Sequence, residues 1–148
     1  MENKKTRDEE ALNLFAKGFN CSQSVSSVFA EKLNIDKETI IKAAGGFGGG
    51  IGSSGNMCGA VTGGIIAIGL KYSSVNSEDT EAKKHVRELA KDFMKSFAGQ
   101  FGSVDCKQIL GYDFSKPEEF EYVHNNNVTR QVCPKFIKFA VQELDKIL

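Results

Sequence analysis

Apolar residues recur every three or four positions over most of this chain, a spacing that places side chains on one face of an α-helix. The pattern predicts an amphipathic helix ending near Gly18, a second helix starting at Asn20 and running through Leu33, and a short third helix starting at Asp36. Asn and Asp are favoured at helix starts because their side-chain oxygens accept hydrogen bonds from free N–H groups.

A glycine-rich segment, residues 45–55, interrupts this pattern. Glycine loses more backbone entropy on ordering than any other residue, so this density predicts a loop that adopts positive φ or lies close to another part of the chain. Residues 57–72 follow and are apolar on every side, which predicts a buried helix. A buried strand fits the periodicity as well, but no other segment offers it a partner strand. Gly59 and Gly63 have a spacing that lets two helices pack closely, by analogy with membrane helices.

The rest of the chain also has mainly helical periodicity. Its predicted features are a long helix from Ser77 to about Ala98, a short helix from Ser103 through Leu110, a mostly loop-like stretch over 111–127 with a helical turn at 117–122, and a final helix starting at Pro134. We therefore expect an all-α protein: a single-domain helical bundle, residues 1–148, of about six to seven helices with a Gly-rich loop before a buried helix.

Composition narrows the function classes. Lys plus Arg and Asp plus Glu each number 19, so the formal net charge is zero. This argues against a nucleic-acid binder or a polybasic membrane-surface protein. The first ten residues lack the apolar region of a secretory signal, and the longest apolar stretch is too short to span a bilayer. We expect a cytoplasmic protein with no nucleic-acid partner and no membrane insertion.

Four cysteines are the main chemical candidates: Cys21, Cys58, Cys106 and Cys133. Cytoplasmic cysteines more often bind metal, catalyse reactions or sense redox state than form structural disulfides. No two form a CxxC pair, so the fold must bring them together if they cooperate. Each falls in the first turn of a predicted helix, where free N–H groups and the helix dipole favour a thiolate and lower the thiol pKa. Each also heads an apolar face, so we expect all four to point inward and meet at one end of the bundle.

The sequence around the second cysteine resembles a family signature. Cys58-Gly59-Ala60-Val61-Thr62-Gly63 is similar to the Cys-Gly-Ala-x-x-Gly motif of the C_GCAxxG_C_C family of redox-active proteins. Cys21, within FNCSQSV, resembles the first hallmark cysteine of that family, and Cys106 and Cys133 resemble the third and fourth. The resemblance covers Gly18 to about Phe136. It implies a redox-active protein from a family associated with oxidoreductase and transporter loci, and it identifies neither a substrate nor a catalytic base.

Three functions remain open at this point. In the first, the four cysteines are catalytic, with Cys58 as the attacking thiolate, and exchange electrons with a redox partner protein or a small-molecule oxidant or reductant. In the second, the same four cysteines bind a metal, either an iron–sulfur cluster or zinc. Gly55 and Gly59 are then candidate cofactor-binding positions, and amides of the 45–55 loop would hydrogen-bond to the cluster.

In the third, the protein is a non-catalytic helical interaction module and the cysteines are small core residues. The small-residue helix face also makes a homodimer a candidate assembly.

Two further patterns are weaker. Residues 50–55 satisfy G-x-G-x-x-G, a dinucleotide fingerprint that requires a preceding strand. Residues 40–44 are instead typical of a helix end, so we do not favour nucleotide binding. His85 and His124 could bind metal or donate a proton, but solvated surface histidines are commoner, and we leave both outside the predicted site.

Overall fold

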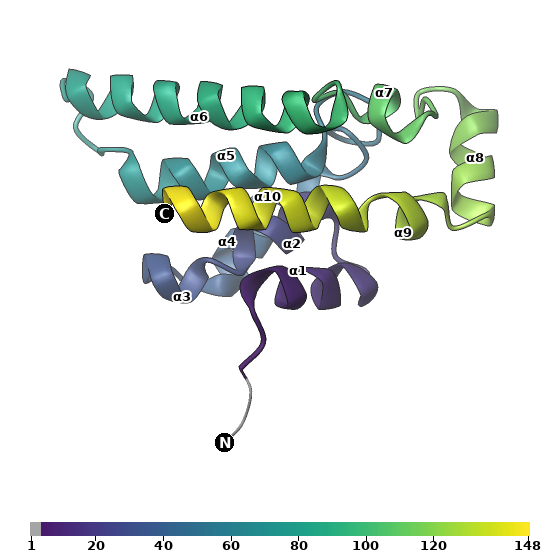
Figure 1. The fold of residues 1–148 in the computed structure, drawn as a ribbon, viewed down its shortest axis with the longest axis horizontal. Coiled ribbons are helices and arrows are strands. Elements are labelled where there is room, and N and C mark those ends of the chain that lie inside the picture. Colours follow the sequence, from purple (N-terminus) through teal and green to yellow (C-terminus); the bar gives the residue numbers. More distant parts are fainter. Residues whose placement is uncertain (1–3) are drawn as a thin grey trace.

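The protein forms ten α-helices and one 3-10 helix across the residues that its computed structural model describes, residues 4–148. Residues 1–3 lie outside the described residues. They are the first three residues of the predicted domain, residues 1–148. In chain order (Figure 1), the elements are α1 (Arg7–Ala16), α2 (Cys21–Ser27), α3 (Ala30–Leu33), α4 (Lys37–Ala43), the 3-10 helix η1 (Gly45–Phe47), α5 (Gly59–Tyr72), α6 (Thr80–Phe101), α7 (Cys106–Leu110), α8 (Pro117–Asn125), α9 (Val128–Val132) and α10 (Pro134–Ile147).

The all-α prediction is therefore confirmed, whereas the expected number of six to seven helices was too low. One reason is that the second predicted helix is divided into α2 and α3. The hydroxyl groups of Ser24 and Ser26 donate hydrogen bonds to carbonyls four residues earlier, an arrangement that tends to bend helices. The helical ladder breaks directly after this segment, at residues 28–29.

The other reason lies in residues 111–127, which we expected to be mostly loop. Here the nine-residue helix α8 begins with Pro117 and carries two glutamates in its first turn. Both features favour a helix start. A left-handed Asn127, with φ of 51°, then separates α8 from the short helix α9. The long helix α6 also begins later than expected, because Asp79 rather than Ser77 caps it by accepting a hydrogen bond from the N–H of Ala82.

Helix α5 is the centre of the bundle and packs against α2 on one side and α6 on another (Figure 1). A Cβ atom at Gly63 would lie 2.6 Å from the carbonyl oxygen of Ser22, and one at Gly64 would collide with the ring of Phe93. The predicted close packing along the glycine face is therefore confirmed. Since these glycines contact helices of the same chain, they no longer give a reason to expect a homodimer.

The C-terminal helix α10 completes the core between α1 and α6. Its buried Phe136 contacts Phe97 and Phe101 of α6, with ring centroids 6.1 and 4.8 Å apart. Along the part of the chain that the structure describes, no helix is long and apolar enough to cross a membrane.

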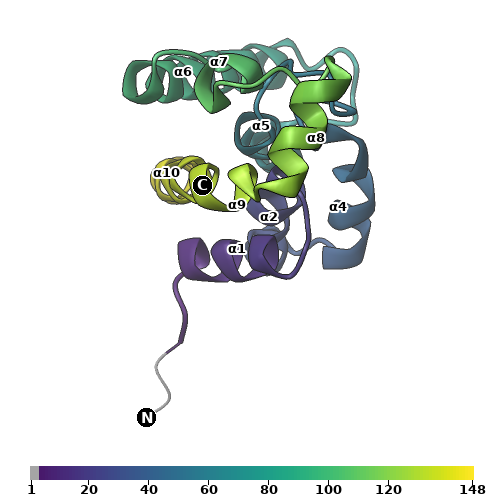
Figure 2. The same ribbon diagram turned by 90° about the vertical axis from the view of Figure 1, so that its right-hand side faces the viewer.

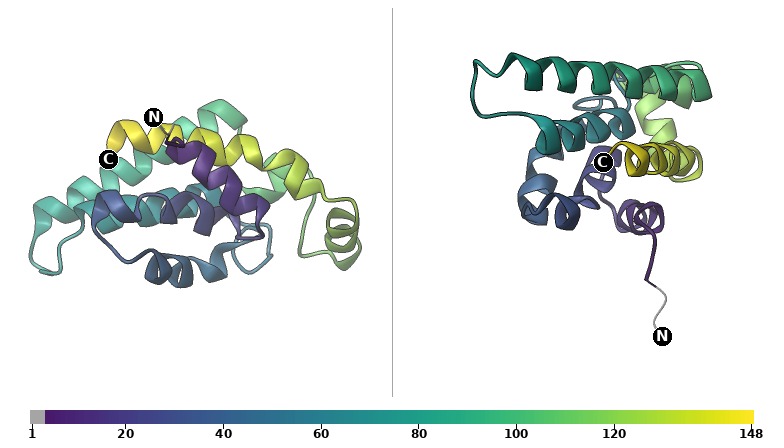
Figure 3. Two further views of the ribbon diagram at one scale, coloured as in Figure 1. Left: turned by 90° about the horizontal axis from the view of Figure 1, so that it is seen from below. Right: turned by 60° about the vertical axis from the view of Figure 1, so that its left-hand side comes forward.

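The starts of α5, α7 and α10 lie at the same end of the molecule, where α8 crosses the bundle (Figures 1 and 2). The view from below shows α8 projecting at this end, beyond α1 and α10 (Figure 3). This end of the bundle therefore brings several helix starts together.

Candidate functional site

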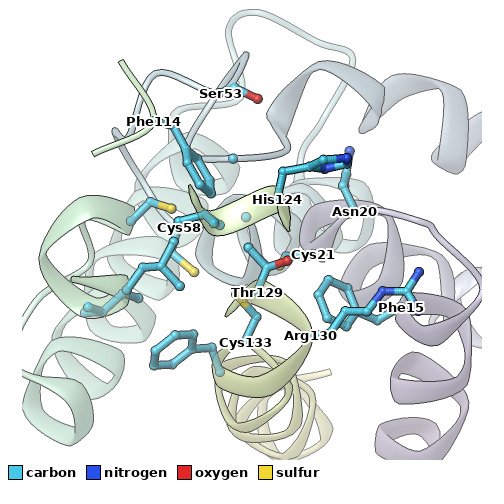
Figure 4. Close-up of a pocket in the computed structure, with 18 of the residues that line it drawn as sticks. Phe15, Asn20, Cys21, Ser53, Cys58, Phe114, His124, Thr129, Arg130 and Cys133 are labelled. Atoms are coloured by element: carbon cyan, nitrogen blue, oxygen red, sulfur yellow. The ribbon is translucent and has the colours of Figure 1, made fainter. Parts of the chain in front are cut away.

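All four cysteines line one cavity of about 300 Å³ at this end of the bundle (Figure 4). Cys21 and Cys106 are the first residues of α2 and α7, and Cys58 and Cys133 directly precede α5 and α10. The prediction that the fold gathers four helix-start cysteines is confirmed. Cys21 is partly exposed and the other three are buried.

The glycine-rich loop and a short bridge hold Cys58 beside Cys106. Met57 and Asp105 form an isolated antiparallel bridge. On either side of it, the N–H of Cys58 donates to Val104 over 2.8 Å and the N–H of Cys106 donates to Asn56 over 2.6 Å. These hydrogen bonds fix both cysteines on adjacent segments of backbone.

Gly50 is where this loop requires glycine most clearly. Its φ is +73°, a region that favours glycine. An added Cβ would lie 2.8 Å from the Cβ of Cys106 and 2.6 Å from the backbone nitrogen of Asn56. The expected loop with positive φ and close approach is therefore confirmed.

Asn20 connects Cys21 to the beginning of the same loop. Its side-chain oxygen accepts a hydrogen bond from the N–H of Gln23 over 2.8 Å, which caps α2 as predicted. Its side-chain nitrogen donates to the carbonyl oxygens of Ala44 and Gly45, each over 3.3 Å. One side chain therefore orients α2 and holds the loop that leads to Cys58.

Cys21 and Cys133 line the same cavity, although they are far apart in sequence. A hydrogen bond between their side chains lowers the pKa of Cys133 and raises the pKa of Cys21 well above its ordinary value. Burial and the charges of the other three cysteines also raise the pKa of Cys21. The ammonium group of Lys135 lowers the pKa of Cys133 further.

The other two thiols behave differently. Burial raises the pKa of Cys58 to about 12, although the backbone N–H groups of Ala60 and Val61 act in the opposite direction. Burial also raises the pKa of Cys106 to about 12. The start of α5 thus lowers the pKa of Cys58 as predicted, but burial outweighs this effect, and the net pKa of three of the four cysteines is raised. For Cys133 the direction is as predicted, but the main cause is Cys21.

Five polar residues besides the cysteines line the cavity, and none of them was in the predicted site: Asn20, Ser53, His124, Thr129 and Arg130. His124, which we left outside the predicted site, lines the cavity wall because α8 carries it there. His85 lies elsewhere, with its ring packed edge-on against Tyr72 at 4.8 Å. No local signal separates the two histidines, since only the unexpected helix α8 places one of them here.

The geometry does not favour the metal alternative. Over residues 4–148, no three His, Cys, Asp or Glu side chains lie close enough together to hold a metal ion. A Cβ at Gly59 would lie 2.8 Å from the Cβ of Cys21, and one at Gly55 would lie 3.3 Å from the carboxylate of Asp113. Both glycines thus serve close packing, and a cofactor-binding role for them stays a prediction.

The dinucleotide fingerprint at residues 50–55 lacks its structural context. The segment is a series of turns preceded by α4 and η1, and no strand occurs anywhere in the described chain. Because the fingerprint needs a strand before the glycines, the structure gives it no support.

Comparison with known proteins finds a family whose model matches most of the chain. A family model described as "Putative redox-active protein (C_GCAxxG_C_C)" matches residues 19–147. The chain belongs to the C_GCAxxG_C_C family. All four cysteines of this C_GCAxxG_C_C protein lie within the matched range.

The chain is also similar to an "Uncharacterized protein" of Archaeoglobus fulgidus, with 38% identity over 71 residues. That match spans 47% of this C_GCAxxG_C_C chain and 47% of the archaeal protein, so the alignment covers about half the length of each. No solved structure matches the chain.

Proposed function

We propose that this protein is a thiol–disulfide redox protein in which Cys133 and Cys21 form the reactive pair. The observation that supports this most is that both cysteines line the same cavity, where contact between their side chains lowers the pKa of Cys133 and raises the pKa of Cys21. A thiolate is the attacking species in disulfide exchange, and a second thiol nearby completes it. Cys133 therefore replaces Cys58 as the proposed attacking residue, since burial raises the pKa of Cys58 to about 12.

The proposed exchange needs a disulfide oxidant, either on a partner protein or in a small molecule. The Cys133 thiolate attacks one sulfur of that disulfide, forms a mixed disulfide and releases the first thiolate. Cys21 then loses its proton and attacks the Cys133 sulfur, forming the Cys21–Cys133 disulfide and releasing the second thiolate. Two protein thiols and one external disulfide become one protein disulfide and two external thiols. A disulfide bond is about 2.0 Å long, so the two side chains close up as it forms.

Cys58 and Cys106 have a different proposed role. Both are buried and stay protonated near neutral pH, because their pKa values are about 12. We expect them to remain reduced while the oxidant is limiting and to shape the wall of the cavity against the reactive pair.

Thiol counting with a limiting disulfide oxidant tests this function. Wild type should lose two thiols per chain, and both should return on reduction. Cys133→Ala should form no intramolecular disulfide, whereas the matched variant Cys106→Ala, which removes another buried thiol of the same cavity, should still lose two. Four thiols left in wild type, or two lost in Cys133→Ala and none in Cys106→Ala, would refute the proposal. Circular dichroism of each variant checks that it has folded.

A further inference from the structure

The apolar part of the cavity wall consists largely of aromatic rings from different parts of the chain: Phe15, Phe19, Phe114, Phe120 and Phe136. Phe114 and Phe120 meet edge to face, with centroids 5.8 Å apart and planes at 77°. Aromatic rings prefer this contact or offset stacking with other rings, so such a wall favours a flat, unsaturated ligand. The volume of about 300 Å³ is at the lower end for ligand pockets, which limits the occupant to a small molecule.

The described part of the cavity lining includes a positively charged side chain but no acidic one. Among the described residues, no Asp or Glu lines the cavity, although the chain contains 19 acidic residues. Arg130 supplies a fixed positive charge, and within residues 4–148 it forms no ion pair. His124 lies on the same side of the cavity, facing Asn20, while the Arg130 side chain extends beside Phe15 (Figure 4). The planar guanidinium of arginine matches a carboxylate through two parallel hydrogen bonds.

We propose that this cavity binds a small aromatic acid, with its ring among the phenylalanines and its carboxylate at Arg130. The aromatic wall favours the ring of the ligand. In the part of the chain that the structure describes, the lining has Arg130 and no acidic side chain, which favours a negatively charged group on the ligand. Binding requires neither a thiolate nor a disulfide, so it goes beyond the proposed exchange reaction and stands or falls separately from it. A bound ligand would also stand between solvent and the Cys133 sulfur, because both line the same cavity.

Calorimetric titration of the reduced protein with benzoate and 2-naphthoate tests the proposal. Each acid is compared with its neutral amide, benzamide or 2-naphthamide, which keeps the ring and removes the charge. At least one acid should bind with a stoichiometry of one and about tenfold more tightly than its amide, as expected for a hydrogen bond to a charged group. If neither acid binds, or if acid and amide bind equally well, the proposal is overturned.

Three variants then assign the contacts. Arg130→Gln should weaken binding of the acid about tenfold, to the affinity of the amide. Phe120→Ala should weaken binding of the acid and of the amide to the same extent. Arg87→Gln, which removes an exposed arginine of α6 outside this cavity, should change neither affinity. Unchanged acid binding in Arg130→Gln would refute the carboxylate site.

The redox proposal has a separate readout in the same experiment. Thiol counting with a limiting disulfide oxidant reports on the exchange alone, because the proposed contacts with the acid include no thiol. In wild type, a saturating acid should slow alkylation of Cys133. Failure of disulfide exchange with intact acid binding would remove the proposed function and leave this site standing. The opposite result would remove only the site.

Discussion

Replacing Gly63 with alanine should separate α2 from α5 and destabilise the protein. In the middle of an exposed helix, the change from glycine to alanine stabilises by about 1 kcal/mol. At this position the new methyl group would lie 2.6 Å from the carbonyl oxygen of Ser22 and 3.0 Å from its Cα. Both atoms belong to the backbone of α2, so no side chain can rotate away to relieve the contact.

The size of the effect follows from the distance. Ordinary contacts of a Cβ begin at 3.4 Å, so α2 must move by roughly 0.8 Å in a tightly packed core. Overpacking of this kind costs about 1–3 kcal/mol, and a backbone partner puts it toward the upper end. After the gain in helix propensity, we expect Gly63→Ala to lower the free energy of unfolding by about 1–2 kcal/mol. The melting temperature should then fall by roughly 2–8 °C.

Gly69→Ala is the matched control, because it lies in the same helix and meets only the Ser73 hydroxyl, at 3.6 Å. It should raise the free energy of unfolding by about 0.5–1 kcal/mol. Thermal and urea unfolding followed by circular dichroism would measure both variants. If Gly63→Ala were as stable as wild type or Gly69→Ala, the close contact between α2 and α5 would not exist as described.

Three further predictions concern the thiols and the cap. Alkylation followed by mass spectrometry should modify Cys133 first, and the midpoint of its pH dependence should lie below the ordinary pKa of 9.0. Cys21→Ala should raise this midpoint pH. An unchanged midpoint would contradict the effect of Cys21 on Cys133. The pKa of Cys58 rises from an ordinary 9.0 to about 12 on folding, so its contribution to stability is complete below pH 9 and disappears as the pH rises toward 12. The free energy of unfolding, measured with urea, should therefore fall less steeply in Cys58→Ala than in wild type as the pH rises over this range. Asn20→Ala should lower the free energy of unfolding by about 1 kcal/mol or more, while Asn20→Asp, which keeps the capping oxygen, should lower it less.

The sequence predicted well those features that depend on neighbouring residues. Asn20 and Asp36 cap helices through their own side chains, as expected, and Pro134 opens the last helix. The same local signals placed each cysteine at a helix start. Their inward direction followed from the apolar faces behind them, and this is why the shared cavity could be expected.

Features that depend on burial or on distant contacts could not be predicted in this way. The pKa of Cys58 rises because desolvation outweighs the N–H groups at the start of α5, and desolvation is set by the whole fold. The proposed pairing of Cys21 with Cys133 joins residues more than a hundred positions apart. His124 and Arg130 reach the cavity on two short helices whose polar sequence is also typical of a loop.

Peptide mapping under non-reducing conditions is the most direct test of the central claim. The protein is treated with one equivalent of a disulfide oxidant, its remaining thiols are blocked, and the linked peptides are identified by mass spectrometry. We predict one dominant disulfide, between Cys21 and Cys133, with Cys58 and Cys106 recovered as free thiols. A dominant disulfide between Cys58 and Cys106, or a mixture of all pairings, would contradict the account.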